Sequence, residues 1–122
     1  MKSGKTSTMP KPKSGEVWLV RFPFTDLTTT KLRPALVVAT HGEDIIVMGL
    51  FSRVPTTLRA TWVLIGDRDG AFGQTGLKKS SILKAEKIAV IHESVFQRRL
   101  GILSADLIAE SQAALKKALL IT

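Results

Sequence analysis

The first two thirds of the chain consist of short apolar runs that alternate with polar residues and are separated by turn-forming residues. This pattern, together with many β-branched and aromatic residues, predicts β-strands. We expect five or more strands, of which five are placed over Glu16–Phe22, Pro34–Thr40, Asp44–Phe51, Ala60–Ile65 and Ser81–Ile91. The last of these runs is interrupted by polar residues near Ala85–Lys87, which predicts a bulge. Polar loops are expected over Thr25–Leu32 and Asp67–Gly76.

The last third of the chain changes from a strand period to a helix period. Ser104 is a good N-cap, and Asp106 in the first turn complements the helix dipole. A shorter helix is possible around Glu93–Arg98. The apolar stripe of the terminal helix is formed by Leu107, Ile108, Ser111, Leu115 and Leu119.

Short strands followed by one helix predict a mainly β domain, either a small barrel or a strongly bent sheet. A chain of 122 residues is long enough for one such domain, which we place over residues 15–122. Residues 1–14 (MKSGKTSTMPKPKS) contain almost nothing to bury and are expected to form a disordered basic tail.

The composition points to a polyanionic partner and a reducing compartment. The net charge is +8, and half of it comes from lysines in the first 13 residues. Nucleic acid is the commonest partner of such a chain. The chain has no cysteine, which excludes disulfides, thiolate catalysis and cysteine-based metal sites. No apolar run is long enough to span a membrane, so we expect a cytoplasmic protein without a membrane partner.

The common signatures of cofactor and metal chemistry are missing from the sequence. No phosphate-binding glycine loop and no nucleophile elbow is present. The histidines, His41 and His92, are far apart and lack carboxylates at ligand spacing. We therefore expect no metal and no cofactor.

Lys84 and Glu86 are the first candidates for chemistry. They lie two residues apart on a predicted strand, so both side chains should project from the same face. A carboxylate base and an ammonium acid at that spacing can straddle a phosphodiester and drive attack by a ribose 2′-hydroxyl. Their mutual attraction keeps both groups ionised, which predicts a modest catalyst. The alternative is an exposed ion pair without a chemical role.

Other residues are candidates for contact with RNA, each with a purely structural alternative. Proline after Arg33 holds that arginine in extended geometry, from which it can clamp a phosphate. Ser52 and Arg53 follow the third strand, where they can touch a phosphate or simply begin a loop. The pair Arg98-Arg99 can contact phosphates or remain solvated. Trp18, Phe22, Phe24 and Trp62 can stack on bases or pack in the core.

Taken in order, several segments resemble the MazF/PemK family of toxins from bacterial toxin–antitoxin systems. These segments are GEVWLVRFPFTDL, KLRPALVV, LFSR, GLKKSSILKAEKIAVI and RRLGILSADL, and the match extends from Gly15 to Leu119. The resemblance implies an SH3-like small barrel of the MazF/CcdB plug type. It also implies a homodimer that cleaves single-stranded mRNA sequence-specifically without metal. A cognate antitoxin protein with an acidic tail is the implied inhibitor.

The resemblance also implies roles for individual residues. Arg33 matches the catalytic arginine of the family, and Lys84 and Glu86 fall where the Kid-type branch has an Arg–Asp acid–base pair. Phe51 departs from the family, because it stands where a threonine is expected, and Ser52 is the nearest hydroxyl. RNA contacts are expected from Arg53 and from the loop residues Phe24, Thr28, Thr29 and Lys31.

Other functions remain open at this point. One alternative is a catalytically weak relative that binds RNA or the antitoxin. Another is a CcdB-like inhibitor of DNA gyrase, and a third is an unrelated β-barrel interaction module.

Overall fold

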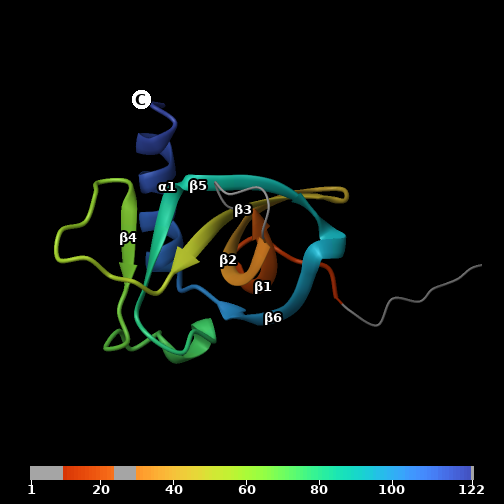
Figure 1. Cartoon of the computed structure of the whole chain (residues 1–122). Helices are drawn as coiled ribbons and strands as arrows, with labels where there is room; N and C mark the ends of the chain where they lie inside the picture. The colour runs from red at the N-terminus through yellow and green to blue at the C-terminus, as the bar shows by residue number, and fades with distance from the viewer. Residues whose placement is uncertain (1–9, 24–29, 122) are drawn as a thin grey trace, which may run out of the picture.

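The computed structural model describes residues 10–23 and 30–121, which form a strongly bent β-sheet and one long helix (Figure 1). The strands are β1 (Glu16–Pro23), β2 (Thr30–His41), β3 (Asp44–Phe51), β4 (Trp62–Ile65), β5 (Ser81–His92) and β6 (Phe96–Ile102). The α-helix is α1 (Ala105–Ala118), and two single 3₁₀ turns are η1 (Gly73–Thr75) and η2 (Glu93–Val95).

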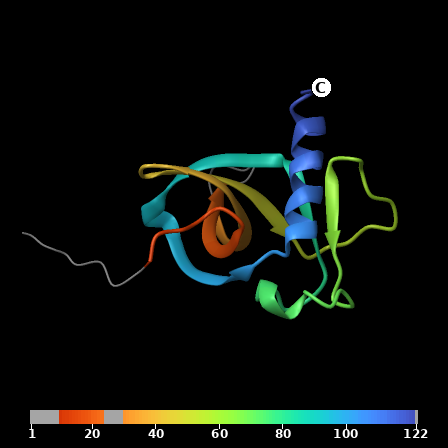
Figure 2. The same cartoon turned by 180° about the vertical axis from the view of Figure 1, so that it is seen from behind.

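The six strands form one antiparallel sheet in the order β4-β5-β3-β2-β1-β6. The predicted mainly β class with a C-terminal helix is therefore confirmed. The sheet is bent but not closed, because within the described residues the edge strands β4 and β6 do not pair with each other. Helix α1 lies beside β4 and β5 at one end of the sheet, as the view from behind shows (Figure 2).

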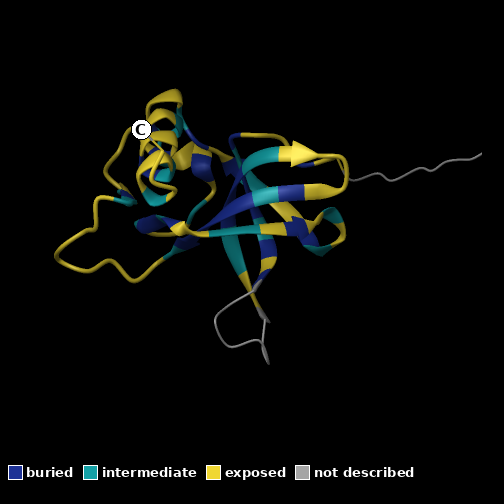
Figure 3. Ribbon diagram, turned by 90° about the horizontal axis from the view of Figure 1, so that it is seen from above, coloured by how far each residue is buried: buried dark blue, intermediate teal, exposed yellow. Residues whose placement is uncertain are grey.

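The core is divided between two sides of the bent sheet. One cluster packs under α1 and includes Leu36, Leu50, Leu83 and Leu107. The other surrounds Trp18, whose ring meets Phe96 edge to face. Buried residues follow the middle strands, whereas the loop between β3 and β4 is exposed from Ser52 to Ala60 (Figure 3). That loop is therefore open to solvent where it leaves β3.

The predicted strands are present, with extended ends in several cases. The predicted bulge is also confirmed, because the pairing of β3 with β5 jumps from Met48–Ile88 to Gly49–Lys84. The predicted helix over Glu93–Arg98 is wrong, since only the short turn η2 forms and β6 begins at Phe96. The expected loop also ends early, because β2 already starts at Thr30.

The terminal helix begins as predicted, but its buried stripe differs at the end. Ser104 caps the helix by accepting a hydrogen bond from the backbone nitrogen of Leu107. Leu119 is 49% exposed, and it lies just after the last helical residue, Ala118. Ala114 is buried in its place.

Part of the predicted tail, Pro10–Ser14, contacts the sheet. The hydroxyl of Ser14 donates a 2.8 Å hydrogen bond to the carbonyl oxygen of Val38. Lys11 lies 3.6 Å from the carboxylate of Glu93. The division into a tail and one domain remains a prediction, and residues 1–9 lie outside the described part. Within that part, no helix combines the length and apolar character needed to cross a membrane.

Candidate functional site

A surface groove lies where β3 ends, and it collects most of the described residues predicted from the sequence to act in a site. It encloses about 580 Å³ and is lined by Arg33, Phe51, Ser52, Arg53, Pro55, Trp62 and Lys84. Three of these residues are cations and none is an acid. The groove is therefore suited to an anionic ligand.

Strand pairing explains why residues distant in sequence meet in this groove. Strand β3 lies between β2 and β5, and β4 pairs with the outer side of β5. Lys84 is opposite Gly49 on one side and Trp62 on the other. Because β3 ends at Phe51, the chain leaves the sheet there, and both Phe51 and Ser52 line the groove. Neighbouring residues within a strand face opposite sides, but Ser52 lies just beyond the end of β3 and therefore lines the same groove as Phe51.

Cations and aromatic rings alternate across the groove in a row formed by Arg33, Phe51, Lys84, Trp62 and Arg59. Arg33 lies 5.3 Å and Lys84 4.8 Å from the centre of the Phe51 ring. Lys84 also lies 4.6 Å from the centre of the Trp62 ring, and Arg59 lies 4.9 Å from it. Each such contact contributes roughly 0.5–1 kcal/mol at an exposed site. We call this arrangement the cation–aromatic row.

The ring of Phe51 fits because the residue two positions earlier on its strand is a glycine. A Cβ at Gly49 would lie 2.9 Å from two carbons of the Phe51 ring and 3.2 Å from the ring of Phe22. The Phe22 ring meets the Phe51 ring edge to face, with centres 6.4 Å apart. Phe51 is thus seated between Gly49 and Phe22, and in the cation–aromatic row it lies between Arg33 and Lys84.

Glu86 lies in the bulge of β5, at the Trp62 end of the row. Its carboxylate accepts hydrogen bonds from Arg59 Nη1 (2.8 Å), Thr61 Oγ1 (2.8 Å) and Trp62 Nε1 (3.0 Å). Partial burial acts to raise the pKa of Glu86, but the hydrogen bonds from Thr61, its own backbone, Trp62 and Arg59 outweigh burial and lower the pKa. The carboxylate is therefore ionised at neutral pH.

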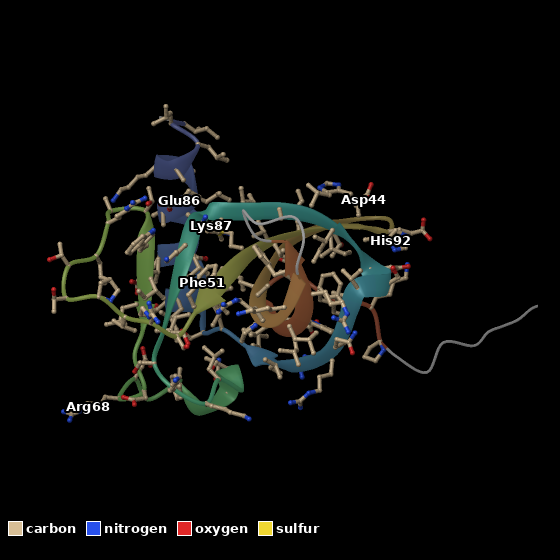
Figure 4. All side chains as sticks on the ribbon, in the orientation of Figure 1. Asp44, Phe51, Arg68, Glu86, Lys87 and His92 are labelled. Atoms are coloured by element: carbon tan, nitrogen blue, oxygen red, sulfur yellow. The ribbon has the colours of Figure 1, made fainter. Side chains whose placement is uncertain are left out.

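Lys84 and Glu86 thus contact the same indole, Lys84 over the ring and Glu86 at the ring nitrogen. Among the described residues, the ion-pair partner of Glu86 is Arg59 rather than Lys84. Glu86 does not line the groove but lies just beyond Trp62. Figure 4 shows Glu86 on β5 and Phe51 on the neighbouring strand β3. The predicted acid–base pair is therefore separated by an indole rather than joined in a salt bridge.

The other predicted contacts are distributed differently. Lys31 is exposed on β2, two residues before Arg33 and hence on the same face of that strand. Trp18 and Phe22 are buried in the core, in agreement with their structural alternative. Arg99 bonds to Glu16 through a 2.9 Å contact, whereas Arg98 lines a different hollow. Phe24, Thr28 and Thr29 lie outside the described residues.

The two histidines have local partners. His92 Nδ1 accepts a 3.1 Å hydrogen bond from the backbone nitrogen of Ser94, and its Nε2 lies 3.7 Å from Glu43. Within residues 10–23 and 30–121, no three histidine, aspartate or glutamate side chains gather as a metal site would require.

Sequence reasoning did not find Arg59, Thr61 or the seat of Phe51. The signal for that seat was present, since a glycine two residues before a phenylalanine on one strand face leaves room for a ring. The Arg59–Glu86 contact joins positions 27 residues apart, and no local sequence pattern predicts it.

Comparisons with known proteins identify the family and the fold. Residues 13–119 match the family described as the PemK-like, MazF-like toxin of type II toxin–antitoxin systems. A search of curated proteins found no significant match. Solved structures with a similar fold share less than 25% of their residues with this chain, so their similarity shows the fold alone.

Three solved structures illustrate that similarity. A mycobacterial endoribonuclease in complex with its cognate antitoxin is 21% identical, with a TM-score of 0.68 over 91% of this chain and 97% of that one. MazF from Deinococcus radiodurans is 21% identical, with a TM-score of 0.69 over 90% and 97% of the respective chains. A MazE–MazF complex from the same organism is 17% identical, with a TM-score of 0.70 over 93% and 99%.

Proposed function

Because the chain belongs to the PemK-like, MazF-like family of type II toxin–antitoxin toxins, we propose that it is a sequence-specific endoribonuclease that cleaves single-stranded RNA without a metal ion. The observation that carries this proposal is the convergence of Arg33, Arg53 and Lys84 on one groove that no acidic residue lines. Such a groove attracts a phosphate backbone, and Trp62 offers a ring on which a base can stack.

The proposed reaction is an internal transesterification of the RNA. The Glu86 carboxylate takes the proton from a ribose 2′-hydroxyl, and the 2′-oxygen forms a bond to phosphorus. Arg33 stabilises the charge that develops on the phosphorane oxygens. Lys84 donates a proton to the departing 5′-oxygen as the bond from phosphorus to that oxygen breaks. The products are a 2′,3′-cyclic phosphate and a 5′-hydroxyl end.

The surroundings of these groups support their roles. The lowered pKa keeps Glu86 in the basic form at neutral pH but also makes it a weak base. Trp62 holds the two groups at separate sides of one ring, which leaves both accessible to a phosphodiester that crosses the end of the groove. Ser52 and Arg53 at the other side, with Lys31 along β2, are proposed to hold the neighbouring phosphates.

We further propose that the toxin forms a homodimer and is inhibited by a cognate antitoxin protein. Two of the similar structures are complexes of a toxin with its antitoxin. An acidic antitoxin tail complements the net charge of +8 of this chain. Light scattering of the purified chain, alone and with the product of an adjacent small reading frame, measures both assemblies.

The decisive experiment is incubation of the purified protein with a long defined RNA in the presence and absence of EDTA. We expect cutting at a limited set of sequences, undiminished by EDTA, with 2′,3′-cyclic phosphate at each new end. Absence of cutting across RNAs of varied sequence would overturn the proposal and leave a protein that only binds. Linear 3′-phosphate ends from the earliest time points would instead exclude attack by the internal hydroxyl.

A further inference from the structure

A second hollow adjoins the groove. It encloses about 290 Å³ and is lined by Leu19, Pro34, Ser52, Gly76, Leu77, Lys78, Lys79, Ser81, Arg98 and Leu100. We call it the lysine-rimmed hollow. It shares Ser52 with the groove, and its residue Pro34 directly follows the groove residue Arg33. The groove and the hollow are therefore continuous at Ser52.

The walls of the lysine-rimmed hollow are fixed before any ligand arrives. Gly76 has φ 75° and lies so close to Leu100 that a Cβ there would overlap the Leu100 carbonyl. The backbone nitrogen of Leu77 donates a 3.1 Å hydrogen bond to the hydroxyl of buried Thr75. Buried Ser81 donates a 3.0 Å hydrogen bond to the carbonyl oxygen of Lys79. The turn that presents Lys78 and Lys79 is thus held at both ends.

The chemistry of the lysine-rimmed hollow combines apolar walls with positive charge. Leu19, Pro34, Leu77 and Leu100 provide flat or branched apolar surface, while Lys78, Lys79 and Arg98 supply cations. No acidic residue lines it. The neighbouring arginine, Arg99, pairs with Glu16 on β1, whereas Arg98 lines the hollow. Its volume lies at the small end of ligand sites, which suits a single nucleotide.

We propose that the lysine-rimmed hollow is a second nucleotide subsite, which takes the base of a nucleotide next to the one in the groove and pairs its phosphates with Lys78, Lys79 and Arg98. The inference rests on the proposed function, since it extends the path of the RNA. Continuity with the groove favours RNA over an acidic peptide. RNA carries one phosphate for each nucleotide, so neighbouring phosphates of one strand can contact the cations of the groove and those of the hollow in turn. The subsite would select the base beside the cleavage point.

The test uses binding of uncleavable single-stranded oligonucleotides that carry 2′-deoxyribose at the cut site. Lys78→Ala combined with Lys79→Ala should weaken binding about tenfold at low salt and reduce the slope of log K against log salt by about 1.4. The matched control is Lys116→Ala combined with Lys117→Ala on the exposed end of α1, which should leave both quantities unchanged. Equal effects of the two double variants would overturn the proposal.

An abasic scan locates the base. Removal of one base next to the cut site should weaken binding to the wild type, and Leu77→Ala should abolish the penalty at that position alone. A penalty unchanged in Leu77→Ala would refute the subsite. Displacement of the oligonucleotide by decaglutamate more effectively than by an oligonucleotide of equal charge would also refute it.

If the wild type cleaves RNA and the lysine variants cleave and bind it normally, only the subsite fails. If the wild type neither binds nor cleaves RNA, the proposed function fails as well.

Discussion

The carboxylate of Glu86 accepts a 3.0 Å hydrogen bond from the indole nitrogen of Trp62, the residue that closes one end of the groove. The same indole carries the ammonium of Lys84 over its ring, 4.6 Å from the centre. One aromatic side chain therefore fixes the separation of the two groups proposed to move protons. Any change at Glu86 acts both on the base and on this spacing, and the two effects need separate variants.

Glu86→Gln should lower kcat for RNA cleavage by about 10²–10⁴, the range typical of a lost general base. Trp62→Phe keeps the base and the ring but removes one hydrogen bond, so it should cost far less. Because hydrogen bonds lower the pKa of Glu86 in the free protein, the acidic limb of the wild-type kcat/KM profile should lie below the usual range of a glutamate, and it should vanish in Glu86→Gln. Steady-state kinetics over pH on a short fluorogenic RNA measure all three.

Glu16→Gln is the control for that experiment. Glu16 is held like Glu86, by an indole (Trp18 Nε1, 2.9 Å) and an arginine (Arg99 Nε, 2.9 Å), but it lies away from the groove. It should therefore leave cleavage unchanged. Equal losses of kcat in the two variants would show that Glu86 stabilises the fold and performs no chemistry.

Lys84→Met should lower kcat about 10²-fold or more, since it removes the proton donor and a positive charge from the phosphate. Lys84→Arg keeps the positive charge and adds a bidentate donor, so it should retain RNA affinity, but a guanidinium gives up its proton far less readily than an ammonium, so kcat should fall nearly as far as in Lys84→Met. Lys87→Met, on the exposed bulge outside the groove, is the matched control and should behave as wild type. A rate in Lys84→Met close to that of Lys87→Met would remove Lys84 from the mechanism.

Gly49→Ala should weaken RNA binding more than it weakens the fold. The new methyl group would meet the Phe51 ring at 2.9 Å, and that ring can escape only toward the groove, because Phe22 lies behind it. The combined change Gly49→Ala with Phe51→Leu makes room again and should restore binding. Isothermal titration with an uncleavable oligonucleotide measures the rescue. If the double variant binds no better than Gly49→Ala, Phe51 does not transmit the effect.

Most of the fold could be predicted because strand patterns are local. The strands are apolar runs bounded by turn residues, such as β3 with its four consecutive buried residues Val47–Leu50, and the exposed Glu86 and Lys87 mark the bulge of β5. Strand β6 was missed because its residues 97–99, QRR, are polar and exposed. Of this strand only Phe96 and Gly101 are buried, so its sequence shows no alternation of apolar and polar residues. The sheet order and the failure of the sheet to close depend on pairing between distant strands, which no local pattern encodes.

The sequence predicted those site residues that match the motifs of the family or that lie on one face of a single strand. Arg33, Ser52, Arg53 and Lys84 do share one groove. The part that sequence could not provide is the contact between loop and strand, because Arg59 reaches Glu86 across the β3–β4 connection. As a result the expected partner of Glu86, Lys84, is replaced by Arg59 in the structure.

Glu16→Gln should also reduce stability in a pH-dependent way. Partial burial raises the pKa of Glu16, but hydrogen bonds from Trp18, Lys13 and Arg99 outweigh it and lower the pKa. A carboxylate with a lowered pKa stabilises the folded state fully above its unfolded value of about 4.3 and loses this contribution as pH falls through the folded pKa. Urea unfolding should therefore show a loss of about 1–2 kcal/mol at pH 7 that shrinks below pH ~4. A constant difference across pH would contradict this account.

Gly76→Ala should be among the most destabilising single changes near the groove. Gly76 adopts φ 75°, and a Cβ there would overlap the Leu100 carbonyl oxygen, so the substitution adds backbone strain to a clash with β6. We expect a loss of about 3 kcal/mol in the free energy of unfolding. Gly73→Ala is the control three residues earlier, because a Cβ there meets nothing within 4 Å. Chemical denaturation compares them, and equal stabilities would mean that the turn does not press against β6 in solution.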